Sequence, residues 1–429
     1  MKLYNLKDKK EEKNFSEAVK LGLGNQQGLF FPKKLPTISH KELSKLLEMD
    51  FLERSEKLLS IIIGDEICSS DIKKQIDAAF SRTTPKITPI TKNIACLELF
   101  HGPTLAFKDF GARFMAQVIS FLNYKKNETI TILTATSGDT GAAVAHAFYE
   151  MKNVKVVILY PKGRISKLQE QLFCTLGKNI VTISVNGSFD ECQNLVKQAF
   201  QDENLKKSIG LNSANSINVS RLFAQMCYYF EAFSLLTPIQ KKNLVISVPC
   251  GNFGNITAGL LAKSLGLPIK SFIAATNSNN TVPRFLETGA WIPKNTISTL
   301  SNAMDISQPN NWPRIEELFK RKSWSLKKLR FGSTSEISTQ ESLIDLKQKG
   351  YISEPHAAVA YDVLKKKIKN EEFGLFLGTA HPSKFKNTVE KILNITLTLP
   401  IELSSRIKLP MFSHNISPNL YELRKFLIK

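Results

Sequence analysis

Residues 129–145 have the sequence TITILTATSGDTGAAVA, and this stretch decides the fold class. Its first seven residues are threonines and apolar side chains, a composition typical of a β-strand. The small residues at 141–145 predict a tightly packed helix, and the apolar run at 154–159 predicts a second strand. A strand, a helix and a further strand in this order indicate a right-handed crossover within a parallel sheet.

The same alternation of strands and helices continues outward from this stretch. Two helices are expected to begin with a capping box, one at Ser166 with Gln169 and one at Ser188 with Glu191. Further candidate strands lie at residues 180–185, 244–248, 271–276 and 374–377. The sequence therefore predicts an α/β fold with largely parallel sheets and helices on both faces. Ligands of such sheets bind at the carboxyl ends of the strands, where the glycine-rich loops of this chain fall.

Residues 1–85 have a different pattern and predict a mostly helical N-terminal domain. Apolar side chains recur near helical spacing from Leu43 to Leu59. Turn residues at 24–36 interrupt this pattern, and we interpret the apolar stretch at 28–32 as an exposed packing loop. At the other end of the chain, residues 396–429 predict a short, partly helical tail.

The charge, cysteine and histidine contents exclude several kinds of function. The 429-residue chain has 58 Lys and Arg against 38 Asp and Glu, a net charge of +20. The lysines occur along the whole sequence without a recognition-helix, zinc-finger or RNP-like pattern, so a solvated surface explains the charge better than nucleic-acid binding. The six cysteines include no Cys-x-x-Cys pair and the six histidines lack metal-ligand spacing. We therefore expect free thiols, a reducing compartment and no metal.

The sequence also gives an expected location. No stretch approaches the roughly 18 apolar residues of a membrane span. The first ten residues contain no apolar core of the kind found in signal peptides. We therefore expect a cytoplasmic protein that has no membrane partner, and nothing in the sequence indicates an obligate protein partner.

A lysine among phenylalanines is the first candidate for chemistry. Residues 101–111, HGPTLAFKDFG, place Lys108 between Phe107 and Phe110, with a glycine on either side. Apolar neighbours disfavour the charged ammonium and so lower the pKa of a lysine. A neutral amine can attack a carbonyl and form a Schiff base. Apolar residues four apart from Phe110 onward predict that an amphipathic helix follows this lysine.

Two glycine-rich loops follow predicted strands and open predicted helices. Residues 134–141 carry hydroxyls and free N–H groups that suit an anion, although a capped turn without a ligand has the same composition. Residues 247–255, SVPCGNFGN, favour a nest of N–H donors around a phosphate, with a tight structural turn as the alternative. The second loop is neither a Walker loop nor a complete Gly-x-Gly-x-x-Gly.

Two further segments add polar side chains near strand ends. Residues 212–221, NSANSINVSR, end in Arg221, whose guanidinium suits a carboxylate or phosphate. The alternative is an asparagine-rich turn that caps the helix expected at residues 222–230. Residues 378–382, GTAHP, offer a hydroxyl at the end of a strand or simply begin a helix. His101, His146 and His356 are candidate acids or bases, but satisfied structural histidines are as common.

Taken together, these segments resemble the threonine synthases, which are fold-type II pyridoxal-phosphate enzymes with a core like that of the tryptophan synthase β subunit. The resemblance is to the bacterial and fungal branch with an extra N-terminal domain, and it covers essentially the whole chain. The matching motifs lie at residues 28–32, 98–110, 136–140, 212–221, 251–255 and 354–356. One departure is Cys250, where the family usually has a serine.

The resemblance implies boundaries for the parts of the chain. The N-terminal domain of the family would occupy residues 1–85. The catalytic core would occupy residues 86–395, with a smaller subdomain at about 112–215. Residues 396–429 would be a C-terminal tail packed on that core.

The resemblance also implies a role for each candidate site residue. Lys108 would hold pyridoxal phosphate through a Schiff base, and Thr379 would face the pyridine nitrogen. The residues that would surround the cofactor phosphate are Gly251, Asn252, Phe253, Gly254 and Asn255. The residues that would bind the substrate carboxylate are Thr136, Ser137, Gly138, Asp139 and Thr140. Ser216 and Arg221 would bind a phosphate group of the substrate itself.

The activity that the resemblance implies is conversion of O-phospho-L-homoserine and water to L-threonine and phosphate. It proceeds by γ-elimination of phosphate and β-addition of water, so phosphohomoserine would be the partner of the chain. The closest alternative is another fold-type II lyase, such as a threonine or serine dehydratase, which needs no second phosphate site. From other classes, a non-catalytic metabolite-binding relative and a nucleic-acid-binding protein remain as alternatives. The intact Lys108 argues against the former.

Overall fold

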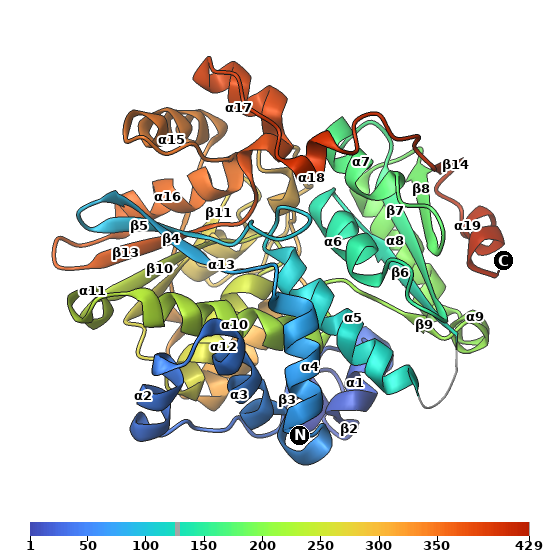
Figure 1. The fold of residues 1–429 in the computed structure, drawn as a ribbon, viewed down its shortest axis with the longest axis horizontal. Coiled ribbons are helices and arrows are strands. Elements are labelled where there is room, and N and C mark those ends of the chain that lie inside the picture. Colours follow the sequence, from blue (N-terminus) through green and yellow to red (C-terminus); the bar gives the residue numbers. More distant parts are fainter. Residues whose placement is uncertain (125–128, 429) are drawn as a thin grey trace.

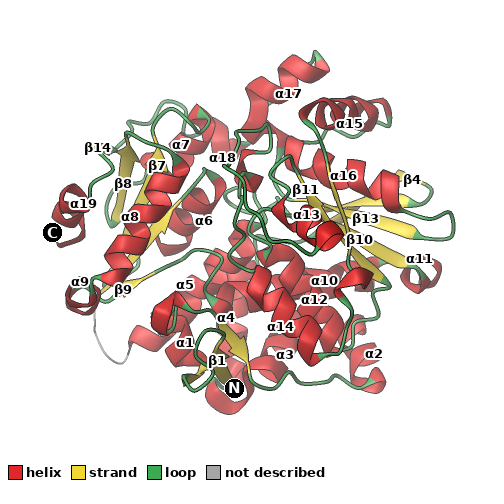
Figure 2. Cartoon of the chain, turned by 180° about the vertical axis from the view of Figure 1, so that it is seen from behind, coloured by secondary structure: helices red, strands yellow, loops and turns green. Residues whose placement is uncertain are grey.

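Two mainly parallel sheets organise the chain, and the computed structural model describes residues 1–124 and 129–428 of it (Figure 1, Figure 2). The larger sheet contains β4 (Lys86–Thr91), β5 (Ile94–Glu98), β10 (Leu244–Pro249), β11 (Ser271–Thr276), β12 (Arg330–Ser333) and β13 (Phe373–Gly378). The strand order is β12-β11-β10-β13-β5-β4. Neighbours are parallel except that β4 pairs antiparallel with β5. The three apolar runs after residue 240 are thus confirmed as strands.

The smaller sheet grows from the stretch that decided the fold class. It contains β6 (Ile130–Ala135), β7 (Val154–Pro161), β8 (Ile180–Val185), β9 (Leu211–Asn212) and β14 (His414–Ile416). The order is β14-β8-β7-β6-β9, and every pair of neighbours is parallel. The C-terminal tail therefore adds an edge strand to this sheet. The sequence did not predict that strand, because three residues are too few to show an alternating pattern.

Helices cover both faces of each sheet, as predicted (Figure 1). In the smaller sheet, Leu133 and Val157 pack with α8 (Phe189–Gln201), while Ile132 and Val156 face the side of α6 (Asp139–Phe148) and α7 (Lys167–Cys174). Successive side chains of a strand point to opposite faces, so each strand serves two cores. The larger sheet packs α16 (Pro355–Lys367) on one face and α10 (Val219–Leu235) with α12 (Gly254–Leu265) on the other.

The local signals for helices are largely confirmed. Both predicted capping boxes form, at the starts of α7 and α8. The amphipathic pattern after Lys108 becomes α5 (Lys108–Tyr124), which packs against α10 between the two sheets. The remaining helices of this region are α9 (Glu203–Ser208), α11 (Pro238–Lys242), α13 (Thr281–Thr288), α14 (Trp312–Arg321), α15 (Glu336–Gln348), α17 (Lys386–Leu393), α18 (Ile401–Ser404) and α19 (Leu420–Ile428).

The N-terminal part is mostly helical but also contains a small sheet. Its helices are α1 (Phe15–Leu21), α2 (His40–Glu48), α3 (Phe51–Ile63) and α4 (Ser69–Phe80). Its antiparallel sheet has the order β2-β1-β3, formed by β1 (Lys2–Asn5), β2 (Glu12–Asn14) and β3 (Phe30–Pro32).

The interpretation of residues 28–32 as an exposed loop is wrong. Phe30 and Phe31 are 1% and 0% exposed, because β3 pairs with β1 and is buried on both faces. A strand buried on both faces has no alternation of apolar and polar residues, so its sequence does not distinguish it from an apolar loop. Within the described residues, no helix has the length and apolar character needed to cross a membrane.

Candidate functional site

The polar loops that the sequence singled out meet in one pocket. They follow β6, β9, β10 and β13, so they lie at the carboxyl ends of strands from both sheets. Every predicted site residue except Gly138 lines this pocket: Lys108, Thr136, Ser137, Asp139, Thr140, Ser216, Arg221, Gly251, Asn252, Phe253, Gly254, Asn255 and Thr379. Gly138 lies within the same loop between two of them. Crevices at this end of parallel strands are the usual ligand sites of α/β folds.

Lys108 begins α5 and is tied to the end of β13. The Phe107 N–H donates to the Thr379 carbonyl oxygen at 2.9 Å, and Ala106 bridges to Ala380. Burial lowers the pKa of Lys108 to about 8. The direction is the one that its apolar neighbours predicted, and at this pKa the amine is partly neutral near neutral pH.

The loop after β6 is shaped by one hydroxyl and one glycine. Thr136 Oγ1 accepts the N–H groups of Gly138 at 3.0 Å and Gly141 at 2.7 Å. Gly138 has φ +127°, a left-handed value that favours glycine. Asp139 opens α6, and its carboxylate is buried against Lys384 with 2.7 Å between Nζ and Oδ1. The carboxylate of Asp139 is thus already paired, so an anion at this loop would meet backbone N–H groups instead.

The loop after β10 requires glycine because other backbone comes close. A Cβ at Gly251 would lie 2.8 Å from Met304 Cα and 2.9 Å from the Ala303 oxygen. Phe253 caps α12 with φ +60°, an uncommon value for a residue other than glycine. Asn255 Oδ1 accepts two tyrosine hydroxyls at 2.6 Å each, but its buried Nδ2 has no partner among the described residues. An unpaired buried donor is unfavourable unless a ligand accepts from it.

Arg221 is a second polar group without a complete set of partners. Its side chain is 2% exposed, and one terminal nitrogen donates to the Ala214 carbonyl oxygen. Among the described residues, its Nε has no hydrogen-bond partner and no carboxylate acts on its charge. Burial lowers its pKa to about 10. Ser216, nearby in the same pocket, accepts from Asn311 Nδ2 at 3.3 Å. A buried guanidinium of this kind suits an anionic ligand.

His356, which the sequence placed in a motif and made a candidate acid or base but not one of the binding residues, also lines the pocket. Its Nδ1 lies 2.5 Å from Glu354 Oε2, and its Nε2 accepts the Ala303 N–H at 3.1 Å. The backbone donor assigns the lone pair to Nε2 and therefore the proton to Nδ1. His356 thus fixes the segment around Ala303 that closes the pocket. The sequence signal was the Glu-Pro-His motif, which alone does not show what the imidazole contacts.

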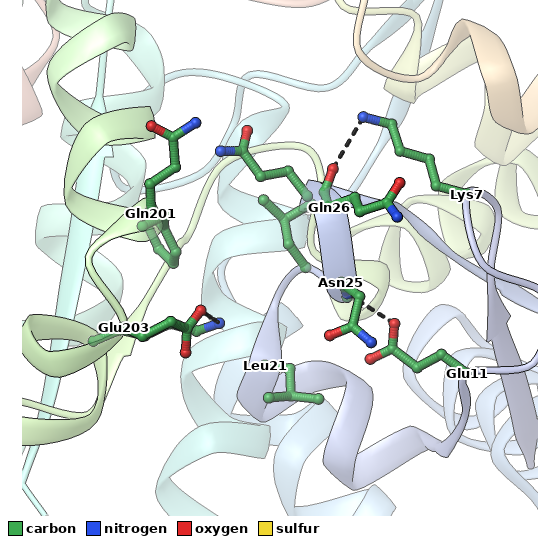
Figure 3. Close-up of a pocket in the computed structure, with 12 residues that line it drawn as sticks. Lys7, Glu11, Leu21, Asn25, Gln26, Gln201 and Glu203 are labelled. Carbon is green, nitrogen blue, oxygen red and sulfur yellow. Dashed lines mark hydrogen bonds and ion pairs between the residues drawn. The ribbon is translucent and has the colours of Figure 1, made fainter.

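A second cavity lies between the N-terminal part and the segment joining α8 to α9 (Figure 3). Figure 3 shows polar side chains along its walls, among them Lys7, Glu11, Gln26, Gln201 and Glu203. It shares no lining residue with the Lys108 pocket and contains none of the predicted site residues. Residues 1–124 and 129–428 contain no cluster of His, Cys, Asp and Glu that could hold a metal.

The Lys108 pocket fits pyridoxal phosphate in three respects. It offers an amine whose pKa burial has lowered to about 8. It offers a glycine-containing turn at the start of α12, with the unpaired Nδ2 of Asn255 beside it, as a phosphate requires. It also offers the Thr379 hydroxyl group, next in the chain after β13. A family model described as pyridoxal-phosphate dependent enzyme matches residues 88–374. The chain is therefore a pyridoxal-phosphate-dependent enzyme.

Closer relatives narrow this class. A family model described as threonine synthase N terminus matches residues 4–80. Threonine synthase of Buchnera aphidicola subsp. Baizongia pistaciae is 73% identical over 429 residues, 100% of both chains. Threonine synthase of Escherichia coli K12 is 60% identical over 100% of this chain and 99% of its own length.

Solved structures agree with the sequence relatives. The crystal structure of threonine synthase from Escherichia coli matches with a TM-score of 0.97 at 59% identity, over 100% of this chain and 99% of that one. Pyridoxal-phosphate-bound threonine synthase from Brucella melitensis matches with a TM-score of 0.91 at 30% identity, over 100% and 98%. The chain belongs to the threonine synthase family.

Proposed function

We propose that this enzyme converts O-phospho-L-homoserine and water to L-threonine and phosphate. The observation that carries the proposal is that one pocket contains both a site suited to the cofactor and a separate site suited to a second anionic group. Lys108 and the turn at residues 251–255 suit the cofactor, and Arg221 adds a separate buried cation that no carboxylate of the described residues neutralises. A dehydratase of serine or threonine needs no second phosphate site, whereas phosphohomoserine brings a second phosphate. The membership of the threonine synthase family supports the same reaction.

For the cofactor, we assign the bond to Lys108 and the phosphate contacts to Gly251, Asn252, Phe253, Gly254 and Asn255. The N–H groups at the start of α12 and the free Nδ2 of Asn255 support that assignment. When bound, pyridoxal phosphate spreads the negative charge that develops on the substrate carbons. Thr379 is assigned to the pyridine nitrogen, where a neutral hydroxyl would not force that nitrogen to be protonated.

For the substrate carboxylate, we assign the loop of Thr136, Ser137, Gly138, Asp139 and Thr140. Asp139 and Thr140 begin α6, so their N–H groups have no carbonyl partner in a preceding turn. The start of a helix also favours an anion through its dipole. Because the Asp139 carboxylate is held by Lys384, the backbone and the hydroxyls of this loop remain to receive the substrate.

Lys108 would also move protons. Burial lowers the pKa of Lys108 to about 8, so its amine, when not bonded to the cofactor, would be able to accept a proton from the substrate α-carbon. Ser216 and Arg221 are assigned to the substrate phosphate. Charge grows on that group as its bond to carbon breaks, and a buried guanidinium stabilises growing negative charge strongly.

Two further assignments accompany this function as proposals. The family N-terminal domain occupies residues 1–85, the catalytic core residues 86–395 with a smaller subdomain at about 112–215, and the tail residues 396–429. The order of secondary structure elements supports them, although β14 of the tail completes the smaller sheet. The cytoplasmic location stays a prediction, as does the absence of nucleic-acid and protein partners.

The test is phosphate release from phosphohomoserine, with and without added pyridoxal phosphate, compared with turnover of serine and threonine. We expect release that depends on the cofactor and exceeds both dehydratase activities. Arg221→Met should lower kcat/KM for phosphohomoserine by about 10²-fold or more. The matched control is Arg284→Met, because the Arg284 guanidinium donates to Asn280 and Thr281 within the described part of the chain and does not line the pocket. No release with cofactor present, or equal effects of both substitutions, would contradict the proposal.

A further inference from the structure

Lys384 is a fully buried lysine that the reaction described above does not use. It lies in the short helical turn Pro382–Phe385 that follows β13, and its side chain is 0% exposed. Its Nζ lies 2.7 Å from Asp139 Oδ1 and donates to the Thr104 carbonyl oxygen at 2.7 Å. Removing an ammonium from water is unfavourable unless strong partners replace the water. The burial of Lys384 is therefore expected to have a structural or functional role that offsets this unfavourable free energy.

The contacts of Lys384 join three parts of the pocket. Asp139 opens α6 beside the smaller sheet, Lys384 follows the central β13 of the larger sheet, and Thr104 precedes Lys108 in its loop. The start of α7 holds both members of the ion pair. Gln169 Nε2 donates to Asp139 Oδ1 at 3.0 Å, and the Ser166 hydroxyl donates to the Lys384 carbonyl oxygen at 3.2 Å. The ion pair thus fastens the loop after β6 to the segment that carries Lys108.

The charge of Asp139 explains why the partner must be a cation. Burial by itself would raise the pKa of Asp139, but the charges of Lys384 and Lys108 outweigh it and hold the pKa well below its usual range. Asp139 is therefore ionised, inside the loop assigned to an anionic substrate group. Without Lys384, that carboxylate would repel the substrate, and Lys108 would be left as a cation that acts on it.

We propose that Lys384 is a positioning residue that neutralises Asp139 and holds its loop against the Lys108 segment. With Asp139 paired, the loop accepts the α-carboxylate of an amino acid, and Lys384 offsets the attraction of Asp139 for the proton on Lys108. The part that concerns the substrate rests on the function proposed above. The part that concerns Lys108 depends only on the chain itself.

The first test measures the protonation of Lys108 without turnover. The full-length chain is freed of cofactor, and the labelling of Lys108 by acetic anhydride is followed by mass spectrometry between pH 6 and 11. The charged groups that face Lys108 are Asp139, Lys384, Arg221 and Glu354, and His356 also faces Asp139. Lys384→Met removes a cation and frees Asp139, so the labelling midpoint should rise by about one pH unit or more. An unchanged midpoint would overturn the proposal.

Asp139→Asn added to Lys384→Met separates charge from packing. The double variant contains neither charge, so its labelling midpoint should return most of the way to that of the unchanged chain. If Lys384→Met fails to fold but the double variant folds, the proposal is also supported, because the unpaired Asp139 carboxylate would then be the cause of the misfolding. Failure of both variants to fold, or equal midpoints in both, would overturn it. Lys384→Arg keeps the charge and should stay closest to the unchanged chain.

The second test uses the enzyme loaded with cofactor. Lys384→Met should raise KM for phosphohomoserine at least tenfold, with a smaller change in kcat, and Asp139→Asn should recover most of the loss. Loss of kcat alone, without recovery in the double variant, would indicate a purely structural lysine. If the unchanged enzyme releases no phosphate from phosphohomoserine, the proposed function is wrong. The labelling of Lys108 still tests the role of Lys384, because it does not depend on turnover.

Discussion

Replacing Gly251 with alanine tests whether the pocket wall is set by contact between two backbone segments. The added Cβ would lie 2.8 Å from Met304 Cα and 2.9 Å from the Ala303 oxygen, whereas ordinary contacts of a Cβ begin at 3.4 Å. Backbone atoms do not rotate aside as the end of a side chain does, so the segment must retreat by about 0.6 Å. Forced overpacking of this kind costs about 1–3 kcal/mol.

The consequence should be local and visible by two methods. For a chain of 429 residues, that cost corresponds to a fall in Tm of roughly 1–3 °C. The Ala303 N–H donates to His356 at 3.1 Å, and the displacement strains this bond. Hydrogen exchange should therefore accelerate around Ala303 more than in the strands of either sheet, and cofactor affinity should fall as the pocket widens.

Gly254→Ala is the matched control in the same loop. Neither glycine has a left-handed φ, so alanine strains the backbone conformation at neither position, and at Gly254, the first residue of α12, alanine is favoured by its helix propensity. At Gly254 the nearest atom is the side-chain Nδ2 of Asn311 at 3.3 Å, which can move. We expect little change in Tm or in exchange for this control without cofactor. If Gly251→Ala were as stable as Gly254→Ala and exchanged at the same rates, the argument from close approach would be refuted.

Three further predictions concern Lys108 and the surface. Lys108→Ala should abolish turnover while thermal unfolding stays cooperative, because alanine suits the start of α5; ordinary activity would reject the assignment. Burial lowers the pKa of Lys108 from 10.5 to about 8, so the unfolded chain binds more protons between these values and stability rises with pH there. The free energy of unfolding of Lys108→Met should therefore exceed that of the original chain, and the difference should be largest below pH 8. Urea titrations that show this difference growing as the pH rises above 8 would contradict the prediction. Despite the net charge of +20, elution from immobilised DNA should need no more than low salt.

The fold was accessible from the sequence wherever a signal was local. The strand at the start of the smaller sheet, the capping boxes at Ser166 and Ser188 and the helix after Lys108 all depend on neighbours within a few residues. The strands that the sequence did not predict depend instead on residues far away in the chain. Residues 30–32 and 414–416 are short strands defined by distant partners, β1 in one case and β8 in the other. Pairing of this kind leaves no periodic pattern in so few residues.

The candidate site divides in the same way. Loops that present backbone N–H groups after a strand carry glycines, hydroxyls and asparagines, so the sequence showed them and the structure brings them into one pocket. Their roles in binding remain proposals. The supporting residues were harder to recognise, because the Glu-Pro-His motif does not show what His356 contacts and no motif marks Lys384. His356 matters through its contact with the backbone of Ala303, and Lys384 through Asp139.

Asp139 shows why composition alone misleads about a binding loop. A carboxylate in a loop assigned to a carboxylate ligand is an apparent contradiction, since like charges repel in a buried site. The contradiction disappears when Lys384 is included, because the pair presents no net charge and the N–H groups of Asp139 and Thr140 at the start of α6 remain for a ligand. The same pair then sets the surroundings of Lys108, since Asp139 and Lys384 act on its pKa in opposite directions. The pKa of Lys108 is therefore determined by charged residues next to both sheets, Asp139 after β6 and Lys384 after β13. The motif around Lys108 supplies only its apolar neighbours.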